Sequence, residues 1–335
     1  PETSVRILFL ECYMDSGNVF ICILWEQRRT PMNATKKSLK LPYKSRLGNN
    51  DAKWGYLFIL PALLLFLVFT AYPLISAFTI SFQKYRPMGS VFVGFENFFN
   101  TFSSELFWKA LWNTLIYTIG SVPVSLIISF ALAMLMTPLR KWAQTVFKAC
   151  YYLPILASGV TLSIVWLWIF DPFDTGLLNR FVSLFGIESQ NWLGTSKTAM
   201  FSLLLMTWLG NHGKNIIIYS AALAGIPQSL FEAADIEGAN SWVKIRRIVI
   251  PLLKPTTLFL LVTGIITSFQ VFQTAYLMTG GGPNNATTTI GFLIFRNAFT
   301  YFDYGAACAQ ALVLTVIIVA LTAVQFKWLG NDVEY

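Results

Sequence analysis

Six long apolar segments, separated by shorter polar stretches, dominate the pattern of this 335-residue chain. A window of about 19 residues finds each of them long enough to cross roughly 30 Å of hydrocarbon as a helix rising about 1.5 Å per residue. The apolar runs do not alternate as the strands of a membrane barrel do, and a lone strand would leave its backbone unpaired in lipid. The pattern therefore predicts an all-α protein whose six transmembrane helices lie at about 56–81, 115–136, 149–170, 200–224, 256–279 and 305–328.

Composition points to the same class of protein. Hydrophobic residues make up 55% of the chain and charged residues 12%, whereas about a quarter of the residues in a soluble domain are charged. The mean hydropathy is +0.58. The net charge of +8 does not indicate a nucleic-acid partner, because the basic residues fall between the apolar runs. The chain is therefore expected to be an integral membrane protein in a lipid bilayer, with no nucleic acid bound.

The distribution of Lys and Arg predicts the orientation of the spans, because basic residues are enriched in cytoplasmic loops. Lys214 lies inside the fourth span and belongs to neither side. Fourteen basic residues lie on one side of the predicted membrane: Lys36, Lys37, Lys40, Lys44, Arg46, Lys53, Arg140, Lys141, Lys148, Lys244, Arg246, Arg247, Lys254 and Lys327. Six lie on the other: Lys84, Arg86, Lys109, Arg180, Lys197 and Arg296. Both termini are therefore expected in the cytoplasm.

The region before the first span divides into two parts. Residues 1–31 start with Pro1 and hold two short apolar runs broken by acidic residues, too short to span and without a signal-peptide cleavage site. We expect Met32 to be the natural start and residues 1–31 to be a non-native or mis-started leader. A basic cytoplasmic N-terminus is then expected at 32–54, a six-span domain at 55–328 and a cytoplasmic tail at 329–335.

Few residues are suited to catalysis or metal binding. Cys12, Cys22, Cys150 and Cys308 show no C-x-x-C spacing, and His212 is the single histidine of the chain. We therefore expect no metal site, no disulfide framework and no cofactor. The sequence LGNHGKNI around Lys214 lacks the first glycine and the Ser or Thr of a phosphate-binding loop. Nucleotide is expected to bind elsewhere, and the chain is not expected to be an enzyme.

The segment 228–251 interrupts the apolar pattern with charged residues. Ser229 and Glu232 fit a capping box that would start a helix near Gln228. Gly238 can turn the chain at positive φ, and Asn240 or Ser241 can cap a second helix. Trp242, Ile245 and Ile248 would share one face of that helix, and Pro251 and Pro255 would stop it before the fifth span. The segment is therefore predicted to be an elbow of two short helices, which we call the elbow (228–251).

The elbow resembles the cytoplasmic signature of binding-protein-dependent ABC transporter permeases, which reads Glu-Ala-Ala, three residues, Gly, nine residues, Ile-x-Leu-Pro. The matching residues are Glu232, Ala233, Ala234, Gly238, Ile248 and Pro251, with Ile250 in place of the leucine. The resemblance implies a type I ABC importer permease (MetI-like) fold, whose elbow is the coupling helix that docks into a groove of a separate ATPase subunit. It implies that Glu232 pairs with a basic residue of the ATPase; the capping box is the alternative role, and both can hold together.

Other stretches resemble the carbohydrate permeases of the maltose and glycerol-phosphate transporter type. These are VGFENFFN (93–100), WNTLIYT (112–118) and LMTGGGPNNATT (277–288). The resemblance implies a permease subunit that carries a sugar or oligosaccharide and assembles with a second permease subunit, two ABC ATPase subunits and an extracytoplasmic solute-binding protein. The loop formed by Gly280, Gly281, Gly282 and Pro283 would contact the binding protein.

Polar residues within the spans are candidates for the substrate pathway. They are Ser158, Asn211, Lys214, Gln270 and Gln273. A lysine is costly in hydrocarbon, so we expect Lys214 to face the bundle interior or a wet cavity. Gln270 and Gln273 are spaced to share a helical face, and Phe269, Phe272 and Tyr276 offer rings on which a sugar can stack. For any one of these residues, hydrogen bonding between spans is the alternative role.

Three alternative functions follow from the same features. A permease for polyamines, phosphate or peptides would share the elbow. An ion-coupled secondary transporter usually places acidic residues at mid-membrane, and no Asp or Glu lies within the six predicted spans. A membrane-embedded enzyme would need an acid, base or metal constellation that the sequence does not offer.

Overall fold

The computed structural model describes residues 10–13, 21–24, 49–85, 89–210 and 212–329. Two compact units, residues 1–62 and 63–335, are each described by themselves. Most of the predicted leader 1–31 and of the segment 32–54 lies outside the described residues, as does the predicted tail 329–335 apart from its first residue.

The first unit contains a two-stranded antiparallel sheet and the start of a helix. In the sheet, β1 (Leu10–Tyr13) pairs with β2 (Ile21–Leu24), and Cys12 lies opposite Cys22. The helix α1 (Asn49–Phe66) begins in this unit and continues along the chain through the π-helical segment η1 (Leu67–Ala71) into α2 (Tyr72–Ser81). Residues 53–81 thus give 29 helical residues of high hydropathy, which confirms the first predicted span.

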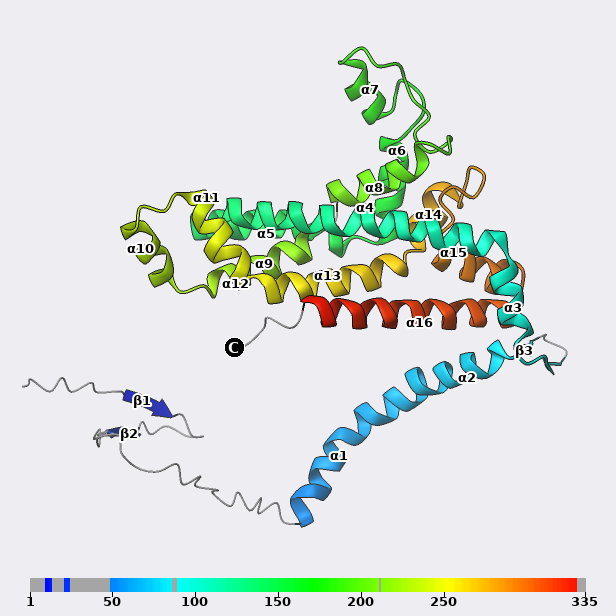
Figure 1. Cartoon of the computed structure of the whole chain (residues 1–335), viewed down its shortest axis with the longest axis horizontal. Coiled ribbons are helices and arrows are strands. Elements are labelled where there is room, and N and C mark those ends of the chain that lie inside the picture. Colours follow the sequence, from blue (N-terminus) through cyan, green and yellow to red (C-terminus); the bar gives the residue numbers. More distant parts are fainter. Residues whose placement is uncertain (1–9, 14–20, 25–48, 86–88, 211, 330–335) are drawn as a thin grey trace, which may run out of the picture. The chain divides into compact units, whose positions relative to one another are not determined.

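The second unit is built almost wholly from helices, and its long helices α4, α13 and α16 lie side by side (Figure 1). Its strands are the short antiparallel pair β3 (Gln83–Lys84) and β4 (Val91–Phe92). After α2, its helices are α3 (Glu96–Ser103), α4 (Glu105–Met136), α5 (Lys141–Leu156), α6 (Gly159–Ile169), α7 (Leu177–Ser183), α8 (Ala199–Gly210), α9 (Gly213–Ala224), α10 (Gln228–Ile236), α11 (Ser241–Lys244), η2 (Ile245–Val249), α12 (Ile250–Leu252), α13 (Lys254–Phe269), α14 (Gln273–Thr279), α15 (Ile290–Phe295), η3 (Arg296–Thr300) and α16 (Tyr304–Leu329).

The second and sixth predicted spans are confirmed as continuous helices. α4 starts ten residues before the predicted span 115–136, because Ser104 caps it by accepting a hydrogen bond from the Phe107 backbone N–H at 3.4 Å. α16 covers the predicted span 305–328. Each helix is long and apolar enough to cross a membrane alone, and counting the bent helix pairs as spans gives up to six in the described residues.

The third predicted span is not the continuous helix that hydropathy suggested. α5 and α6 meet at a bend of 98°. Ala157 and Ser158 take up extended backbone between them, and the Ser158 hydroxyl accepts a hydrogen bond from the Val160 backbone N–H at 3.3 Å. A serine that caps a new helix ends the old one, because its own backbone cannot be helical.

The fourth predicted span is broken at His212, between α8 and α9. Nε2 of His212 lies 2.6 Å from the Trp208 carbonyl oxygen. In an uninterrupted helix, this oxygen would accept a hydrogen bond from the His212 backbone N–H. Because a carbonyl only accepts, Nε2 carries the proton. Nδ1 lies 3.1 Å from the Ser129 hydroxyl of α4. The buried imidazole thus takes over a backbone bond and fixes the break against α4.

The fifth predicted span is broken between α13 and α14. The Val271 carbonyl in this break accepts a hydrogen bond at 2.7 Å from the Thr289 hydroxyl, which lies eighteen residues further on. The Val271 N–H donates to the Ser268 carbonyl at 3.2 Å. Both backbone groups of Val271 are therefore satisfied within the protein, as irregular backbone at membrane depth requires.

The core of the second unit consists of three apolar clusters along α4. One joins α4 to α13, α15 and α16; a second joins it to α9, η2 and α13; the third joins it to α8 and α14. The buried α4 residues of these clusters are Phe107 and Ala110 in the first, Val122, Leu126 and Ala133 in the second, and Tyr117 in the third. α4 is therefore the axis around which the broken helices pack.

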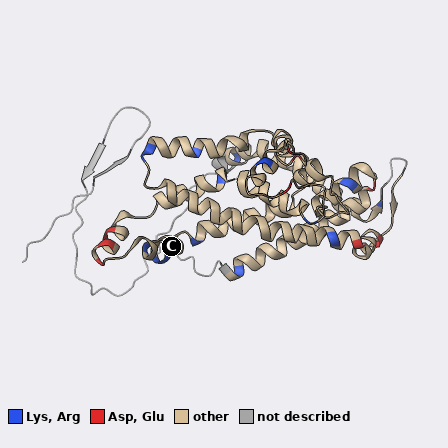
Figure 2. Cartoon of the chain, turned by 90° about the horizontal axis from the view of Figure 1, so that it is seen from above, with Lys and Arg blue, Asp and Glu red and all other residues tan. Residues whose placement is uncertain are grey.

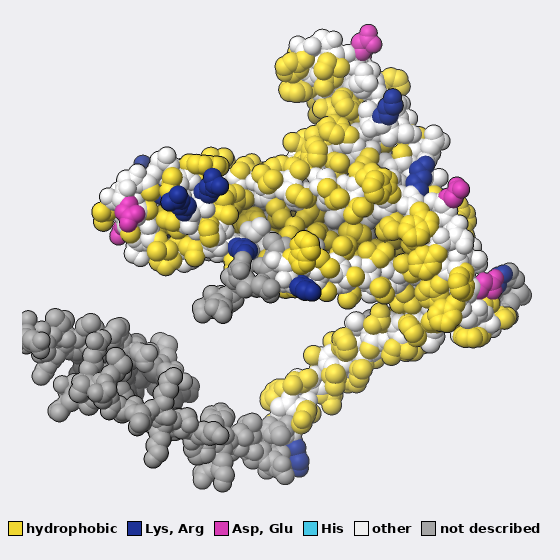
Figure 3. Space-filling model, viewed as in Figure 1, with side chains coloured by type: hydrophobic (Ala, Val, Ile, Leu, Met, Phe, Trp, Pro, Cys, Tyr) yellow, Lys and Arg dark blue, Asp and Glu magenta, His cyan; other side chains and the backbone are white. Residues whose placement is uncertain are grey.

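Charged side chains gather at the two ends of the second unit, and the helices between them are largely free of charge (Figure 2). Figure 3 shows the side chains between these ends as a nearly continuous apolar surface on the visible face. A surface of this kind is unfavourable in water and is satisfied by hydrocarbon.

Candidate functional site

The elbow forms as two short helices joined by a tight turn, as predicted. α10 ends in a turn in which Gly238 has φ +74°. The Gly238 N–H donates to the Asp235 carbonyl at 3.0 Å, and the Ala239 N–H donates to the Ala234 carbonyl at 2.9 Å. This is the Schellman arrangement that glycine favours at a helix C-terminus. Asn240 then caps α11 by accepting from the Val243 N–H at 2.9 Å, which confirms its predicted role.

One detail of the predicted elbow is wrong. Pro227, with φ −59°, occupies the N-cap of α10, so Ser229 is already inside the helix and the described residues provide no side-chain cap there. Ser229 and Glu232 therefore do not form a capping box. The second helix runs without a break from Ser241 through η2 and α12 to Leu252, so it ends one residue after Pro251 and before the fifth span, as predicted. The chain bends by 64° only at Leu253, just before Pro255 in the first turn of α13.

The tip of the elbow is exposed and its base is buried. Among the signature residues, Glu232 and Ala233 are exposed and Ala234 is half-buried. Ile236 at the tip is 88% exposed and Trp242 is 66% exposed. Val249 at the base, and Leu253 just after it, are buried against α4 and α9. Apolar side chains beside charges on an exposed helix pair are suited to docking into a groove of another protein.

An ion pair that sequence analysis missed spans the turn of the elbow. Lys244 of α11 donates to the Asp235 carboxylate of α10. The Lys244 side chain is 20% exposed and that of Asp235 is 64% exposed. The pair links the two helices, although its exposure limits its strength. The sequence feature that could have predicted this ion pair is a pair of opposite charges, nine residues apart, on either side of a glycine turn.

The predicted pathway residues lie at the three helix breaks. Ser158 is the N-cap of α6, Gln270 ends α13, and Gln273 begins α14. Lys214 is the second residue of α9. All four are exposed on the surface of this chain. Asn211 lies outside the described residues.

Two of these breaks contact each other directly. A Cβ on Gly159 would lie 2.6 Å from Oε1 of Gln273, so the Gln273 side chain rests on the first residue of α6. The neighbouring rings of Phe272 and Tyr276 are stacked, with centroids 5.5 Å apart and planes 17° apart, and Phe295 of α15 lies 4.5 Å from Phe272. Amide and stacked rings thus lie beside the start of α6.

Two predictions about these polar residues need correction. Gln270 and Gln273 do not share a helical face, because the helix is interrupted between them. Lys214 does not face the interior of this chain, because its side chain is exposed. The second alternative for Lys214, a wet cavity, remains a prediction.

The glycine-rich loop is folded compactly at the end of the second unit that lies opposite the elbow (Figure 1). Gly280 and Gly281 adopt positive φ, as do Asn284 and Asn285. A Cβ on Gly281 would lie 2.5 Å from the Thr288 hydroxyl and 2.6 Å from the Phe292 ring, so only glycine fits there. Gly280 and Asn284 are exposed, whereas Gly281 is buried and Gly282 and Pro283 are half-buried. Of the four residues predicted to contact the binding protein, Gly280 is therefore the exposed one.

The residues that fix this loop were not recognised from the sequence. Thr287, Thr288 and Thr289 are fully buried. The Thr287 hydroxyl donates to the Gly282 carbonyl at 2.9 Å, and that of Thr288 donates to the Gly281 carbonyl at 3.1 Å. A run of three threonines after a glycine loop was the available signal, since such hydroxyls bond readily to nearby backbone.

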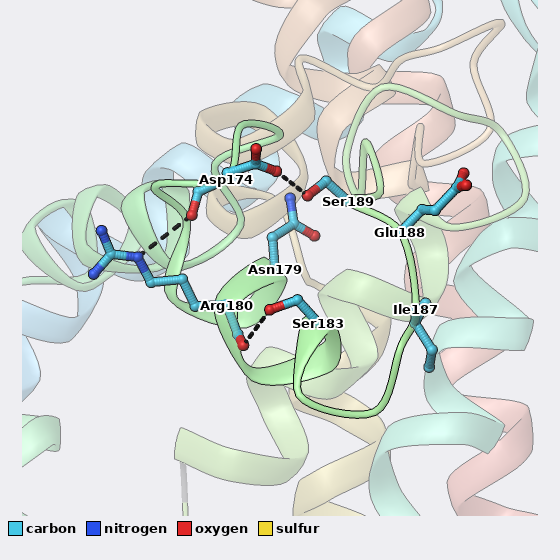
Figure 4. A pocket seen from close by; sticks show the side chains of 7 residues that line it. All are labelled: Asp174, Asn179, Arg180, Ser183, Ile187, Glu188 and Ser189. Carbon is cyan, nitrogen blue, oxygen red and sulfur yellow. Dashed lines mark hydrogen bonds between the residues drawn. The ribbon is translucent and has the colours of Figure 1, made fainter.

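A polar pocket of about 460 Å³ lies at α7, well away from the elbow (Figure 1). Its lining residues are Asp174, Asn179, Arg180, Ser183, Ile187, Glu188 and Ser189 (Figure 4). The buried Asn179 organises it: its amide donates to the Asp171 and Gln190 carbonyls at 3.0 and 3.2 Å, and its oxygen accepts from the Trp192 indole at 2.7 Å. The hydrogen bonds of Asn179 thus tie residues 171, 190 and 192 together beside the pocket.

The broken helices, the elbow and the fixed loop are the features of a membrane transport subunit, and comparison with known proteins gives the family. Residues 121–333 match the model of the binding-protein-dependent transport system inner membrane component. The chain belongs to this family and is a multi-pass inner-membrane protein.

Relatives and solved structures agree with this assignment. The chain is 33% identical over 277 residues to the arabinooligosaccharides transport system permease protein AraP of Bacillus subtilis, covering 82% of this chain and 88% of the relative. It is 32% identical to the sn-glycerol-3-phosphate transport system permease protein UgpA of Yersinia pestis, covering 87% and 99%. It is also 32% identical to the trehalose/maltose transport system permease protein MalF of Thermococcus litoralis, covering 84% and 96%.

The fold matches a chain in the crystal structure of a bacterial ABC transporter involved in the import of the acidic polysaccharide alginate. The TM-score is 0.76 at 24% identity, covering 85% of this chain and 98% of the other. A chain of a bacterial alginate ABC transporter in complex with an alginate pentasaccharide-bound periplasmic protein gives a TM-score of 0.75 at 24% identity. The predicted ABC importer permease fold is confirmed.

Proposed function

We propose that this chain is the membrane-spanning permease subunit of an ATP-driven importer that carries a sugar or oligosaccharide delivered by an extracytoplasmic binding protein. The elbow is the observation that supports this most strongly, because its turn, exposed tip and signature residues suit docking on a separate ATPase. The relatives named above transport arabinooligosaccharides, glycerol phosphate and trehalose or maltose, which favours a carbohydrate.

The proposed assembly contains this chain, a second permease subunit, two ABC ATPase subunits and a binding protein. ATP is hydrolysed in the ATPase subunits, and this chain carries out no catalysis. The chain lies in the bacterial cytoplasmic membrane with both termini in the cytoplasm, as the excess of basic residues on the elbow side indicates. Residues 55–328 form the permease domain, and residues 228–251 are the coupling elbow within it.

The elbow is built to transmit force. Closure of the ATPase dimer would move its exposed tip at Ile236, and the Gly238 turn with the Asp235–Lys244 pair would keep the two helices together. The buried Val249 at its base and Leu253 just after it would pass the movement into the bundle. Alternating access then follows from two arrangements of the same bundle, one open to each side.

The three helix breaks are the proposed substrate pathway. Discontinuous helices place polar backbone and side chains at membrane depth, where they line a cavity and not the lipid. Ser158, Lys214, Gln270 and Gln273 are exposed on this single chain and would face the second permease subunit across such a cavity. The half-exposed ring of Tyr276 is suited to stacking against a sugar.

Transport by the reconstituted complex tests the proposal. The chain is placed in proteoliposomes with its partner permease, ATPase and binding protein, and uptake of arabino-oligosaccharides, maltose, trehalose and glycerol phosphate is measured. We expect uptake of at least one of them that requires ATP and survives dissipation of the proton gradient. Uptake of polyamines, phosphate or peptides instead would replace the substrate class. Uptake that ignores ATP but stops when the gradient collapses would identify an ion-coupled transporter.

A further inference from the structure

The glycine-rich loop is latched onto α4 by residues of the WNTL stretch. Asn113 of α4 donates from its amide to the carbonyls of Asn285 and Thr288, at 2.9 and 3.0 Å. The Thr114 hydroxyl accepts from the Ile290 N–H at 2.9 Å, where α15 begins. Thr114 is fully buried and Asn113 is 7% exposed. Two neighbouring residues of α4 thus fix both ends of the segment 285–290, about 175 residues away in the sequence.

Additional bonds hold the same segment from two sides. The Lys109 ammonium, one turn earlier on α4, donates to the Asn284 carbonyl at 2.6 Å. Arg296 of η3 donates to the Asn285 side-chain oxygen at 3.4 Å. The loop is therefore a fixed extension of α4 and α15, and Lys109, Asn113 and Thr114 form what we call the latch.

The other end of α4 packs on the base of the elbow. Val122, Leu126 and Ala133 of α4 share one apolar cluster with Val249 of the elbow and with Leu253, two residues after it. Phe231 of α10 and Phe130 of α4 pack against this cluster. α4 is one helix of 32 residues, about 48 Å long at 1.5 Å per residue, which continues through Pro123 and carries both the latch and this cluster. The third, fourth and fifth spans are broken at mid-length, so they transmit displacement along their axes less directly.

We propose that α4 is the strut through which docking of the binding protein at the glycine-rich loop changes the ATPase rate at the elbow, and that Asn113 and Thr114 are the positioning residues that attach the loop to it. This rests on the proposed function. A fixed loop, a continuous helix and a shared core at the elbow provide the contiguous packed path that coupling between distant sites needs. Without the latch, the loop would still meet the binding protein, but its displacement would not reach α4.

Two threonines of α4 allow a matched test. Thr114→Val removes the hydroxyl that accepts from Ile290 N–H and leaves that buried N–H unpaired. Thr118→Val makes the same change one turn later, at a residue that is 4% exposed and whose hydroxyl has no hydrogen-bond partner among the described residues. Asn113→Leu removes both amide bonds to the loop. Thr114→Ser keeps the hydroxyl and serves as the conservative rescue.

The experiment titrates sugar-loaded binding protein against the complete complex in proteoliposomes and measures ATP hydrolysis. Co-purification of the ATPase with each variant controls for folding. For Thr114→Val and Asn113→Leu we expect maximal stimulation to fall about fivefold or more, at a half-saturating concentration close to that of the wild type. Thr118→Val and Thr114→Ser should behave as the wild type.

The outcomes separate this proposal from the proposed function. Wild-type complex that no binding protein stimulates would overturn both. Normal stimulation in the wild type and in every variant would overturn the strut alone. Maximal stimulation that is retained at a raised half-saturating concentration would also overturn it, because the latch would then only shape the docking surface. Failure of Thr114→Val or Asn113→Leu to co-purify with the ATPase, while Thr118→Val does, would make the latch a folding element and overturn the strut as well.

Discussion

At the scale of single residues, Gly213 shows how closely the broken fourth span approaches its neighbour. A Cβ at this position would lie 2.4 Å from the Tyr151 carbonyl oxygen and 2.7 Å from the Tyr152 Cα. Both atoms belong to the backbone of α5, which cannot move as a flexible side chain would. The contact brings the start of α9 directly against α5, beside the buried His212.

We therefore expect Gly213→Ala to lower the free energy of unfolding by about 1–3 kcal/mol through overpacking. Gly210→Ala is the control, because its new Cβ would find its nearest neighbour, the Trp166 indole nitrogen, at 3.8 Å. Both substitutions favour helical backbone equally, so their difference isolates the contact. Thermal unfolding of both variants in detergent, followed by tryptophan fluorescence, measures it. Equal melting temperatures would contradict the close packing of α9 on α5.

Glu232 carries the predicted contact with the ATPase. Since it takes no part in a capping box and its side chain is exposed, its charge is available to a partner. We expect Glu232→Gln to reduce ATP-driven transport and stimulated ATP hydrolysis severalfold, in keeping with loss of a charge-assisted hydrogen bond. The stability of the isolated chain should not change.

Glu237→Gln provides the comparison for this prediction, because Glu237 is also an exposed acid of the elbow but lies outside the signature. Transport and ATP hydrolysis at wild-type rates in Glu232→Gln would contradict an ion pair between Glu232 and the ATPase. An equal loss in Glu237→Gln would assign the effect to the overall charge of the elbow.

At the scale of elements, the helix breaks are the feature that separates this bundle from a simple set of spans. Ser158 lies at the break of the third span, and Lys214 lies just after the break of the fourth. Gln270 and Gln273 flank the break of the fifth. Gln273 rests on Gly159, so the breaks of the third and fifth spans form one polar region next to the stacked Phe272 and Tyr276 rings.

We expect Gln273→Leu and Lys214→Leu to change which sugar is carried, or its rate, without loss of membrane insertion. The matched changes Gln325→Leu and Lys327→Leu lie at the end of α16, away from the breaks, and should leave uptake unaltered. Uptake of a panel of sugars by the reconstituted complex distinguishes them. If both break variants transport every sugar as the wild type does, these side chains do not belong to the pathway.

Sequence analysis predicted the elements that depend on local chemistry. Hydropathy placed α4 and α16, and Gly238 and Asn240 placed the turn of the elbow, because each signal is contained within a few residues. The start of α10 was also predicted, but for the wrong reason, since Pro227 begins the helix ahead of Ser229.

The hydropathy pattern could not predict the helix breaks or the latch, because both depend on residues far apart in the chain. His212 ends α8 with the help of Ser129, and Thr289 satisfies the break at Val271. Asn113 was visible only as part of a motif, and its partners at 285 and 288 follow from the fold. The predicted pathway residues were chosen for their polarity, whereas the position of Ser158, Lys214, Gln270 and Gln273 at or beside helix breaks needed the structure.

At the scale of the whole molecule, the second unit has two differently built ends joined by a helix bundle. The elbow and its basic neighbours lie at one end, and the glycine-rich loop lies at the other (Figure 1). The central claim is that the elbow end meets the ATPase in the cytoplasm. Orientation and partner are therefore tested together.

The most direct measurement uses Ile236→Cys, at the exposed tip of the elbow, in a chain whose four native cysteines are replaced by serine. Asn284→Cys, exposed in the glycine-rich loop, marks the opposite end. The account predicts that Cys at 236 cross-links to the ATPase subunit and reacts with an impermeant thiol reagent only from the cytoplasmic side, whereas Cys at 284 reacts only from outside. Labelling of position 236 from outside, or its failure to cross-link to the ATPase in an active complex, would contradict it.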